Sequence, residues 1–176
     1  MRRRLVPILV FCLAALAACE RRDAPNPGTA PGQSATADGR FRHRLSGDVS
    51  GGYRPVAETS GGWRVESLFI GQPAAFEAWE AGRREAAPLI LVLSGPEGRI
   101  RLTPRVYDLT DDSLHLVADT GAGTADDGKA TLDARIDQGG LATARRNLGD
   151  RTPVITGSLT IGSERVPFSL GWWNGD

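Results

Sequence analysis

Few side chains in this sequence could carry out nucleophilic, acid–base or metal chemistry. The 176 residues include two cysteines and two histidines, His43 and His115. These are too few for a zinc site built from cysteine and histidine ligands. No serine at a recognisable elbow and no paired acid accompanies either histidine, so the sequence does not indicate a Ser-His-Asp hydrolase. On an extended strand, the His43 side chain would point to the same face as those of Phe41 and Leu45, near the core. His115 would point to the face opposite that of Leu114.

One acidic residue stands at the end of an apolar segment. Asp119-Thr120-Gly121-Ala122 follows the alternating Leu114 and Leu116. This tetrapeptide resembles the active-site signature of retropepsin-like aspartic proteases, whose aspartate shares a proton with its twin across a dimer. The resemblance implies an aspartic-type hydrolase with Asp119 as the catalytic residue. The alternative interpretation is an ordinary junction of a strand with a turn, because Asp, Thr and Gly all favour turns.

A second acidic group lies nearby, in Asp126-Asp127-Gly128-Lys129. Together with Asp119 it could suggest calcium. A calcium loop needs oxygen ligands at alternating positions, however, and Gly121 and Gly123 occupy two of these. We therefore expect a solvated hairpin loop, and we predict neither a metal nor a cofactor.

The amino-terminal residues indicate export. Three arginines precede Leu5 to Ala18, which are fourteen residues without a charge. A membrane-spanning helix needs about 20 apolar residues, so this segment is typical of a secretory signal instead. It ends in Leu16-Ala17-Ala18-Cys19, which resembles the lipobox of bacterial lipoproteins. An ordinary signal peptide cut near these alanines, with Cys19 an incidental thiol, is the alternative.

The lipobox resemblance implies a processing route and a location. Residues 1–18 would be removed by the lipoprotein-processing machinery, and Cys19 would carry a diacylglyceryl group on its sulfur and an acyl chain on its amine. Two or more chains anchor a protein stably to a bilayer. Glu20 stands where lipoproteins retained in the inner membrane of enteric bacteria often have Asp. The resemblance therefore favours the periplasmic face of the outer membrane.

The next segment lacks the residues needed for a core. Residues 20–40 contain three prolines, three glycines and no aliphatic side chain larger than alanine. We predict that residues 19–40 form a lipidated, flexible tether and that residues 41–176 form one globular domain. Lys and Arg together equal Asp and Glu at 21 each, and this balance gives no electrostatic case for nucleic-acid binding.

Residues 41–176 show short apolar segments separated by turn residues. The continuous apolar run at 89–93 is typical of a strand buried on both faces, and 130–136 alternates with period two. A further segment alternates Ile100, Leu102 and Val106 with arginines. Residues 155–161 and 166–172 flank Gly162-Ser163, as in a hairpin. The pattern predicts an all-β fold, either an antiparallel β-sandwich or a partly closed barrel.

Two stretches depart from this period. Pro73 to Gly82 has proline in its first turn with Phe76 and Trp79 three residues apart, and Gly139 to Leu148 places its apolar residues on one face. We predict one or two short helices here. Adjacent Trp172 and Trp173 should point to opposite faces of a strand.

These observations favour a lipid-anchored cell-envelope protein with a non-catalytic binding or structural β-domain. An aspartic-type hydrolase at Asp119 is the alternative. Carbohydrate binding across Trp172 or Trp173 is a third hypothesis, because an exposed aromatic side chain can form part of a binding patch.

Overall fold

The computed structural model describes residues 40–57, 62–121 and 128–175. These residues form a single ten-stranded sheet with two short helices, in the order β1-β6-β7-β8-β9-β10-β2-β3-β4-β5. The strands are β1 Phe41–Arg44, β2 Gly51–Pro55, β3 Arg64–Ile70, β4 Leu89–Gly95, β5 Gly98–Leu102, β6 Pro104–Thr110, β7 Ser113–Asp119, β8 Lys129–Ile136, β9 Ile155–Ile161 and β10 Glu164–Trp173. The helices are α1 Pro73–Glu80 and α2 Gln138–Arg146. The predicted all-β fold with one or two short helices is confirmed, with two helices present.

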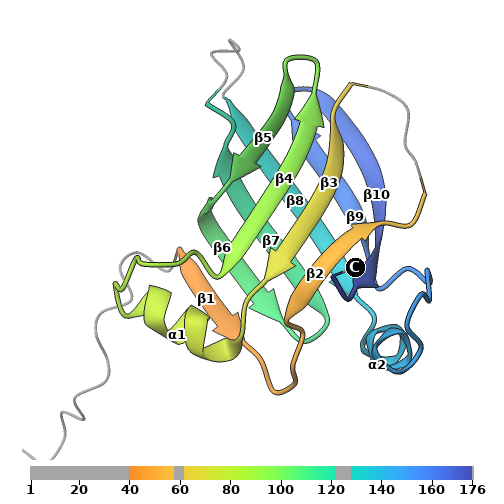
Figure 1. The fold of residues 1–176 in the computed structure, drawn as a ribbon. Helices are drawn as coiled ribbons and strands as arrows, with labels where there is room; N and C mark the ends of the chain where they lie inside the picture. Colours follow the sequence, from red (N-terminus) through yellow and green to blue (C-terminus); the bar gives the residue numbers. More distant parts are fainter. Residues whose placement is uncertain (1–39, 58–61, 122–127, 176) are drawn as a thin grey trace, which may run out of the picture. The chain divides into compact units, whose positions relative to one another are not determined.

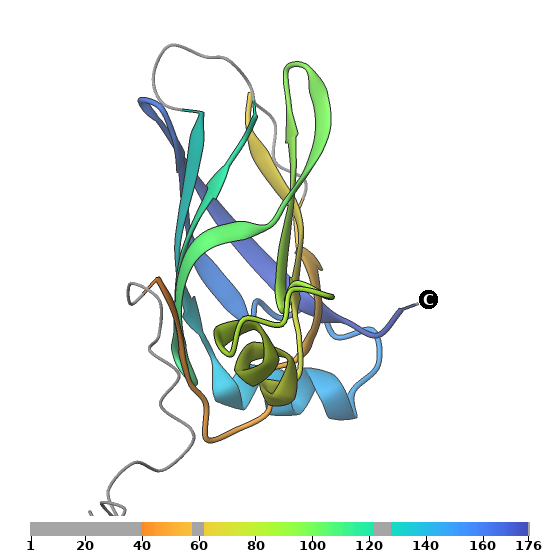
Figure 2. The same ribbon diagram turned by 90° about the vertical axis from the view of Figure 1, so that its left-hand side faces the viewer.

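The sheet is curled into a half-barrel, as Figures 1 and 2 show. A short connection explains the curl. β5 and β6 are far apart in the strand order, yet only Thr103 separates them in the chain. Two residues along an extended chain span about 7 Å, so the two ends of the sheet must come together at this corner. Figure 2 shows the chain passing from β5 to β6 across the molecule.

One pairing differs from the expected antiparallel arrangement. β1 lies parallel to β6, with Phe41 opposite Tyr107, whereas the other neighbouring strands pair antiparallel. β1 is therefore an edge strand added beside the long antiparallel meander. Its four residues join the helix α1 to the sheet, because Phe41 and His43 contact α1 through Trp79 and Phe76.

The concave face of the sheet holds the hydrophobic core. Leucines of β3, β4, β7 and β8 are fully buried there, and α1 adds Phe76. The largest fully buried side chains include Tyr53, Tyr107, Phe76, Leu68, Leu91, Leu116 and Leu132. Each such side chain contributes about 1.5–3 kcal/mol by leaving water. In the described part of the chain, no helix is long and apolar enough to cross a membrane.

Two β-bulges reverse the alternation of side chains along a strand. The register shifts between Val65 and Ser67 in β3, and between Pro104 and Val106 in β6. The extra residue lets two inward side chains lie three positions apart, as Val65 and Leu68 do. In β6 the same shift turns Val106 to the outer face beside Val117, so its expected place on the side of Ile100 and Leu102 is wrong.

The curl also requires two strands to approach closely at one glycine. An added Cβ at Gly157 in β9 would stand 2.0 Å from the carbonyl oxygen of Asp133 and 2.8 Å from the Cα of Ala134 in β8. Both contacts are with backbone, so neither can be relieved by a side-chain rotation. No residue other than glycine fits this position without separating the two strands.

We therefore expect Gly157→Ala to destabilise the domain by about 3 kcal/mol or more, as overpacking of a closed core does. Gly47→Ala is the matched control, because its Cβ would meet nothing closer than 3.8 Å. Urea unfolding followed by tryptophan fluorescence would measure both free energies. Equal stability of the two variants would contradict the close approach of β8 and β9.

Candidate functional site

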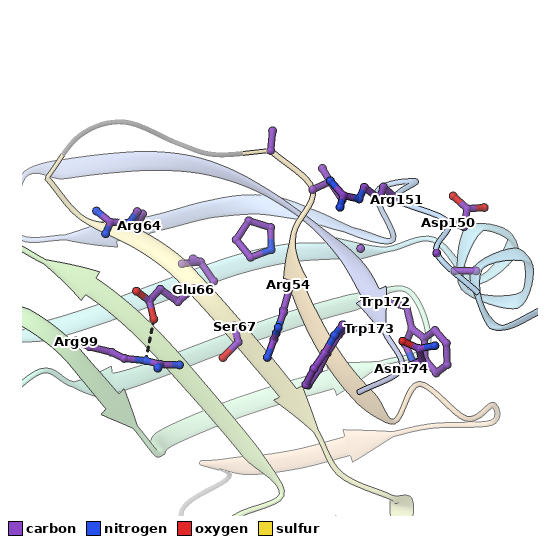
Figure 3. A pocket seen from close by; sticks show the side chains of 17 residues that line it. Arg54, Arg64, Glu66, Ser67, Arg99, Asp150, Arg151, Trp172, Trp173 and Asn174 are labelled. Carbon is purple, nitrogen blue, oxygen red and sulfur yellow. Dashed lines mark ion pairs between the residues drawn. The ribbon is translucent and has the colours of Figure 1, made fainter. Parts of the chain in front are cut away.

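One concavity is a groove on the outer face of β10, β2, β3 and β5, close to the end of α2. Its volume is about 1020 Å³, and the segment after α2 forms one wall. Six of the lining residues carry the argument below: Arg54, Arg64, Glu66, Arg99, Arg151 and Trp173. Figure 3 shows these side chains arriving from several separate elements. We call this surface the outer groove.

The bulge in β3 supplies two neighbouring groove residues. Val65 and Leu68 both face the core, and the extra residue between them leaves Glu66 and Ser67 both in the lining of the outer groove. In a regular strand these two side chains would point to opposite faces. The bulge therefore places a carboxylate and a hydroxyl side by side in the floor of the outer groove.

Trp173 and Arg54 form a stacked pair in the outer groove. β10 pairs with β2 so that Trp173 lies opposite Gly52, which has no side chain to displace the indole. The guanidinium carbon of Arg54 lies 3.4 Å from the centroid of the Trp173 ring. Figure 3 shows the Arg54 side chain between Ser67 and Trp173. Stacking holds the guanidinium plane in place and leaves its edge N–H groups able to donate.

A second glycine brings the groove wall against the sheet. A Cβ at Gly171 in β10 would stand 2.9 Å from Cγ1 of Val56 and 3.4 Å from the carbonyl oxygen of Thr152. The missing side chain lets the chain after β2 and the segment after α2 meet over β10. Arg151 and Asp150 of that segment thereby become part of the outer groove.

The described lining residues of the outer groove carry a net positive charge. Four arginines and two acids line it. Glu66 forms an ion pair with Arg99, whose Nε lies 2.8 Å from Oε2 of Glu66. Hydrogen bonds from Thr152 lower the pKa of the Asp150 carboxyl. Arg54, Arg64 and Arg151 form no ion pair with another described residue. Three cationic side chains are therefore available to an anion from solution.

A different polar cluster lies between α1 and the sheet. Oε1 of Glu80 accepts a hydrogen bond from the Tyr107 hydroxyl at 3.1 Å and lies 2.9 Å from Nδ1 of His43. Tyr107 is buried, and the His43 and Glu80 side chains are 15% and 20% exposed. Burial, with the Glu80 carboxylate beside it, raises the pKa of the Tyr107 hydroxyl. A hydroxyl kept protonated next to a carboxylate is suited to donating a hydrogen bond, and the cluster fastens α1 to β1 and β6.

Aromatic rings and Arg84 enclose this cluster. Tyr107 contacts Phe41 and Phe76 at centroid distances of 5.2 and 5.4 Å. The guanidinium of Arg84 covers the Trp79 ring at 4.4 Å. The predicted placement of His43 near the core is confirmed, but the sequence analysis did not find its partner Glu80, which lies 37 residues away on α1.

Asp119, the candidate catalytic residue, lies at the end of β7. Its side chain is 51% exposed and its Oδ1 lies 3.0 Å from the Nη1 nitrogen of Arg105. Thr120 is buried, and Gly121 follows with a positive φ of 69°. The described geometry is that of a strand turning into a loop, with a cation as the partner of the aspartate.

The remaining predicted residues fall in several places. His115 lies on the outer face of β7 with its Nδ1 2.7 Å from Asp133, as its parity indicated. Trp172 packs against the core near Arg145 of α2 and also lines the outer groove, into which Trp173 points with Arg54 over its ring. Cys19, the tether and Asp126-Asp127 lie outside the described residues. Within the described ranges, no three His, Cys, Asp or Glu side chains come together as a metal site.

Comparison of the chain with protein-family models, with curated proteins and with solved structures found no match in any of the three. The outer groove and the cluster around Glu80 are therefore interpreted from their own geometry.

The Glu80 cluster yields a stability prediction. Glu80→Ala should destabilise the domain by about 1–3 kcal/mol, because the buried Tyr107 hydroxyl loses its acceptor. Glu80→Gln should cost less, since its amide oxygen can still accept. Thermal unfolding of both variants and of Tyr107→Phe would measure this. Equal losses of stability in Glu80→Gln and Glu80→Ala would show that the hydrogen bond accepted by Glu80 contributes nothing.

Proposed function

We propose that this protein is a lipid-anchored component of a bacterial cell envelope, and that its β-domain binds a ligand or partner without catalysis. The observation that carries the binding role is the outer groove, in which Arg54, Arg64 and Arg151 have no ion-pair partner among the described residues and Arg54 stacks on the Trp173 ring. Such a set of preoriented donors favours recognition.

The lining chemistry favours binding over hydrolysis. General acid–base catalysis needs a titratable group free to exchange a proton with the substrate. The two acids of the outer groove are both engaged, Glu66 by Arg99 and Asp150 by Thr152. Arginine stays protonated and so serves as a donor and a charge, without acting as a base.

The anchoring half of the proposal rests on the lipobox resemblance at Leu16-Ala17-Ala18-Cys19. Lipidation of Cys19 by the lipoprotein-processing machinery would place the domain at a membrane, and Glu20 favours the periplasmic face of the outer membrane. The tether of residues 20–40 would span about 25 Å as a coil, at 5–6 Å times the square root of its length.

The anchor can be tested by labelling cells with a palmitate analogue. The wild-type protein should be labelled and Cys19→Ala should not, because the sulfur that receives the lipid is gone. Immunoblotting of the same samples controls for expression. Equal labelling of the two proteins would contradict the anchor.

The binding surface can be tested by photo-crosslinking in intact cells. A benzoylphenylalanine in place of Asn174, an exposed groove residue, should yield a crosslinked adduct. The same group in place of Arg135, exposed on β8 and outside the outer groove, is the control. Adducts from both positions alike, or from neither, would count against a binding role for this groove.

A further inference from the structure

The outer groove also indicates the chemistry of what it holds. From its charge and shape we propose that it binds an acidic oligosaccharide, a chain of sugar units bearing carboxylate or phosphate groups. This inference rests on the proposed binding function and adds the ligand class to it.

The positions of the arginines require more than one negative group on the ligand. Arg54 comes from β2, Arg64 from the start of β3 and Arg151 from the segment after α2. Figure 3 shows the three spread along the outer groove, and they do not converge on one point. A single phosphate ion could satisfy one guanidinium. An extended ligand with several anions would satisfy all three with charge-assisted hydrogen bonds.

The volume and the neutral polar groups suit a sugar chain. About 1020 Å³ exceeds what one small anion fills and is enough for several sugar rings. Ser67 and Asn174 line the same surface and can hydrogen-bond to hydroxyl groups. The Trp173 indole lies in the same lining, with the Arg54 guanidinium over its ring.

An acidic peptide fits less well, because β10, β2 and β3, three of the four strands under the groove, offer no free edge; β5, at the end of the sheet, pairs with β4 alone. β10 pairs with β9 and β2, and β3 pairs with β2 and β4. A peptide cannot add to β10, β2 or β3 as a further strand, which is a common way for a sheet to bind one. Recognition on these three strands must therefore use the side chains of the outer groove, and eight of the 17 lining residues are charged or polar.

A flat anionic membrane also fits less well. The arginines line a concavity, and the exposed Arg54 side chain is stacked against the Trp173 ring. Basic residues that bind a bilayer act through charge near an extended surface. A chain that enters the groove can reach the Arg54 guanidinium more directly than a headgroup in a planar membrane can.

Calorimetry and tryptophan fluorescence on the purified lipidated protein in detergent would test the proposal. The probes are a galacturonic acid tetramer, a neutral galactose tetramer of the same linkage, a tetraglutamate peptide, inorganic phosphate and phosphatidylglycerol vesicles. The acidic tetramer should bind at least about 10-fold more tightly than the neutral one, and added salt should weaken its binding.

Variants of the outer groove locate the binding. Arg54→Gln and Arg151→Gln should each weaken binding of the acidic tetramer about five-fold, corresponding to about 1 kcal/mol each. Arg135→Gln on β8 removes the same charge outside the outer groove and should leave affinity unchanged. All three arginines are exposed, so melting temperatures should stay close to that of the wild type.

Several outcomes would overturn the proposal. Equal binding of the acidic and neutral tetramers would remove the role of charge, and equal weakening by Arg135→Gln would remove the role of the outer groove. Tighter binding of tetraglutamate or of the vesicles would assign the groove to an acidic peptide or a membrane. If inorganic phosphate displaces the acidic tetramer at the same total concentration of negative charge, the outer groove is a site for single anions. If no probe binds while benzoylphenylalanine at position 174 still crosslinks in cells, the proposed ligand class is wrong and the proposed binding function stands.

Discussion

The connection of β5 to β6 through Thr103 is the constraint on which this architecture depends. These two strands lie far apart in the order of the sheet, yet the chain between them is too short to cross a flat sheet of this width. The sheet must curl until its two ends meet. Curling creates an inside, filled by leucine and aromatic side chains, and an outside on which the remaining side chains gather.

The same curl explains the irregularities of the strands. Gly157 permits the backbones of β8 and β9 to approach to a distance that excludes a Cβ, and the two bulges re-aim side chains where regular alternation would fail. On the outer face, the bulge of β3 turns Glu66 and Ser67 the same way. The bulge keeps the apolar side chains of β3 towards the core of the curled sheet, and its two polar side chains thereby become part of the outer groove.

The two polar clusters of the domain contrast in how their charges are satisfied. Between α1 and the sheet, Glu80 is matched by His43 and Tyr107, and aromatic rings shield the group from water. In the outer groove, Arg54, Arg64 and Arg151 have no acidic partner among the described residues. A satisfied, half-buried cluster stabilises the fold, whereas a set of unpaired guanidinium groups is available to a ligand.

Strong periodic patterns made much of this fold predictable from the sequence. The apolar run at 89–93, the alternation at 130–136, the Gly162-Ser163 hairpin and both short helices appear where local composition indicated. β2 was not predicted, because Gly51, Gly52 and Pro55 are residues typical of turns. The apolar residues Val65 and Leu68 are three positions apart, which departs from the period of two of a strand. This spacing is visible in the sequence but does not by itself reveal a bulge.

The sequence alone determined the fold class, the placement of most strands and the candidate lipidation residue, because these depend on the order of neighbouring side chains. Tertiary structure decided the parallel pairing of β1, the partner of His43 and the outer groove. Arg54, Arg99 and Arg151 lie on segments separated by about 50 residues, and no local pattern links them. Only the curl of the sheet and the close contacts at Gly171 bring such distant side chains to one surface.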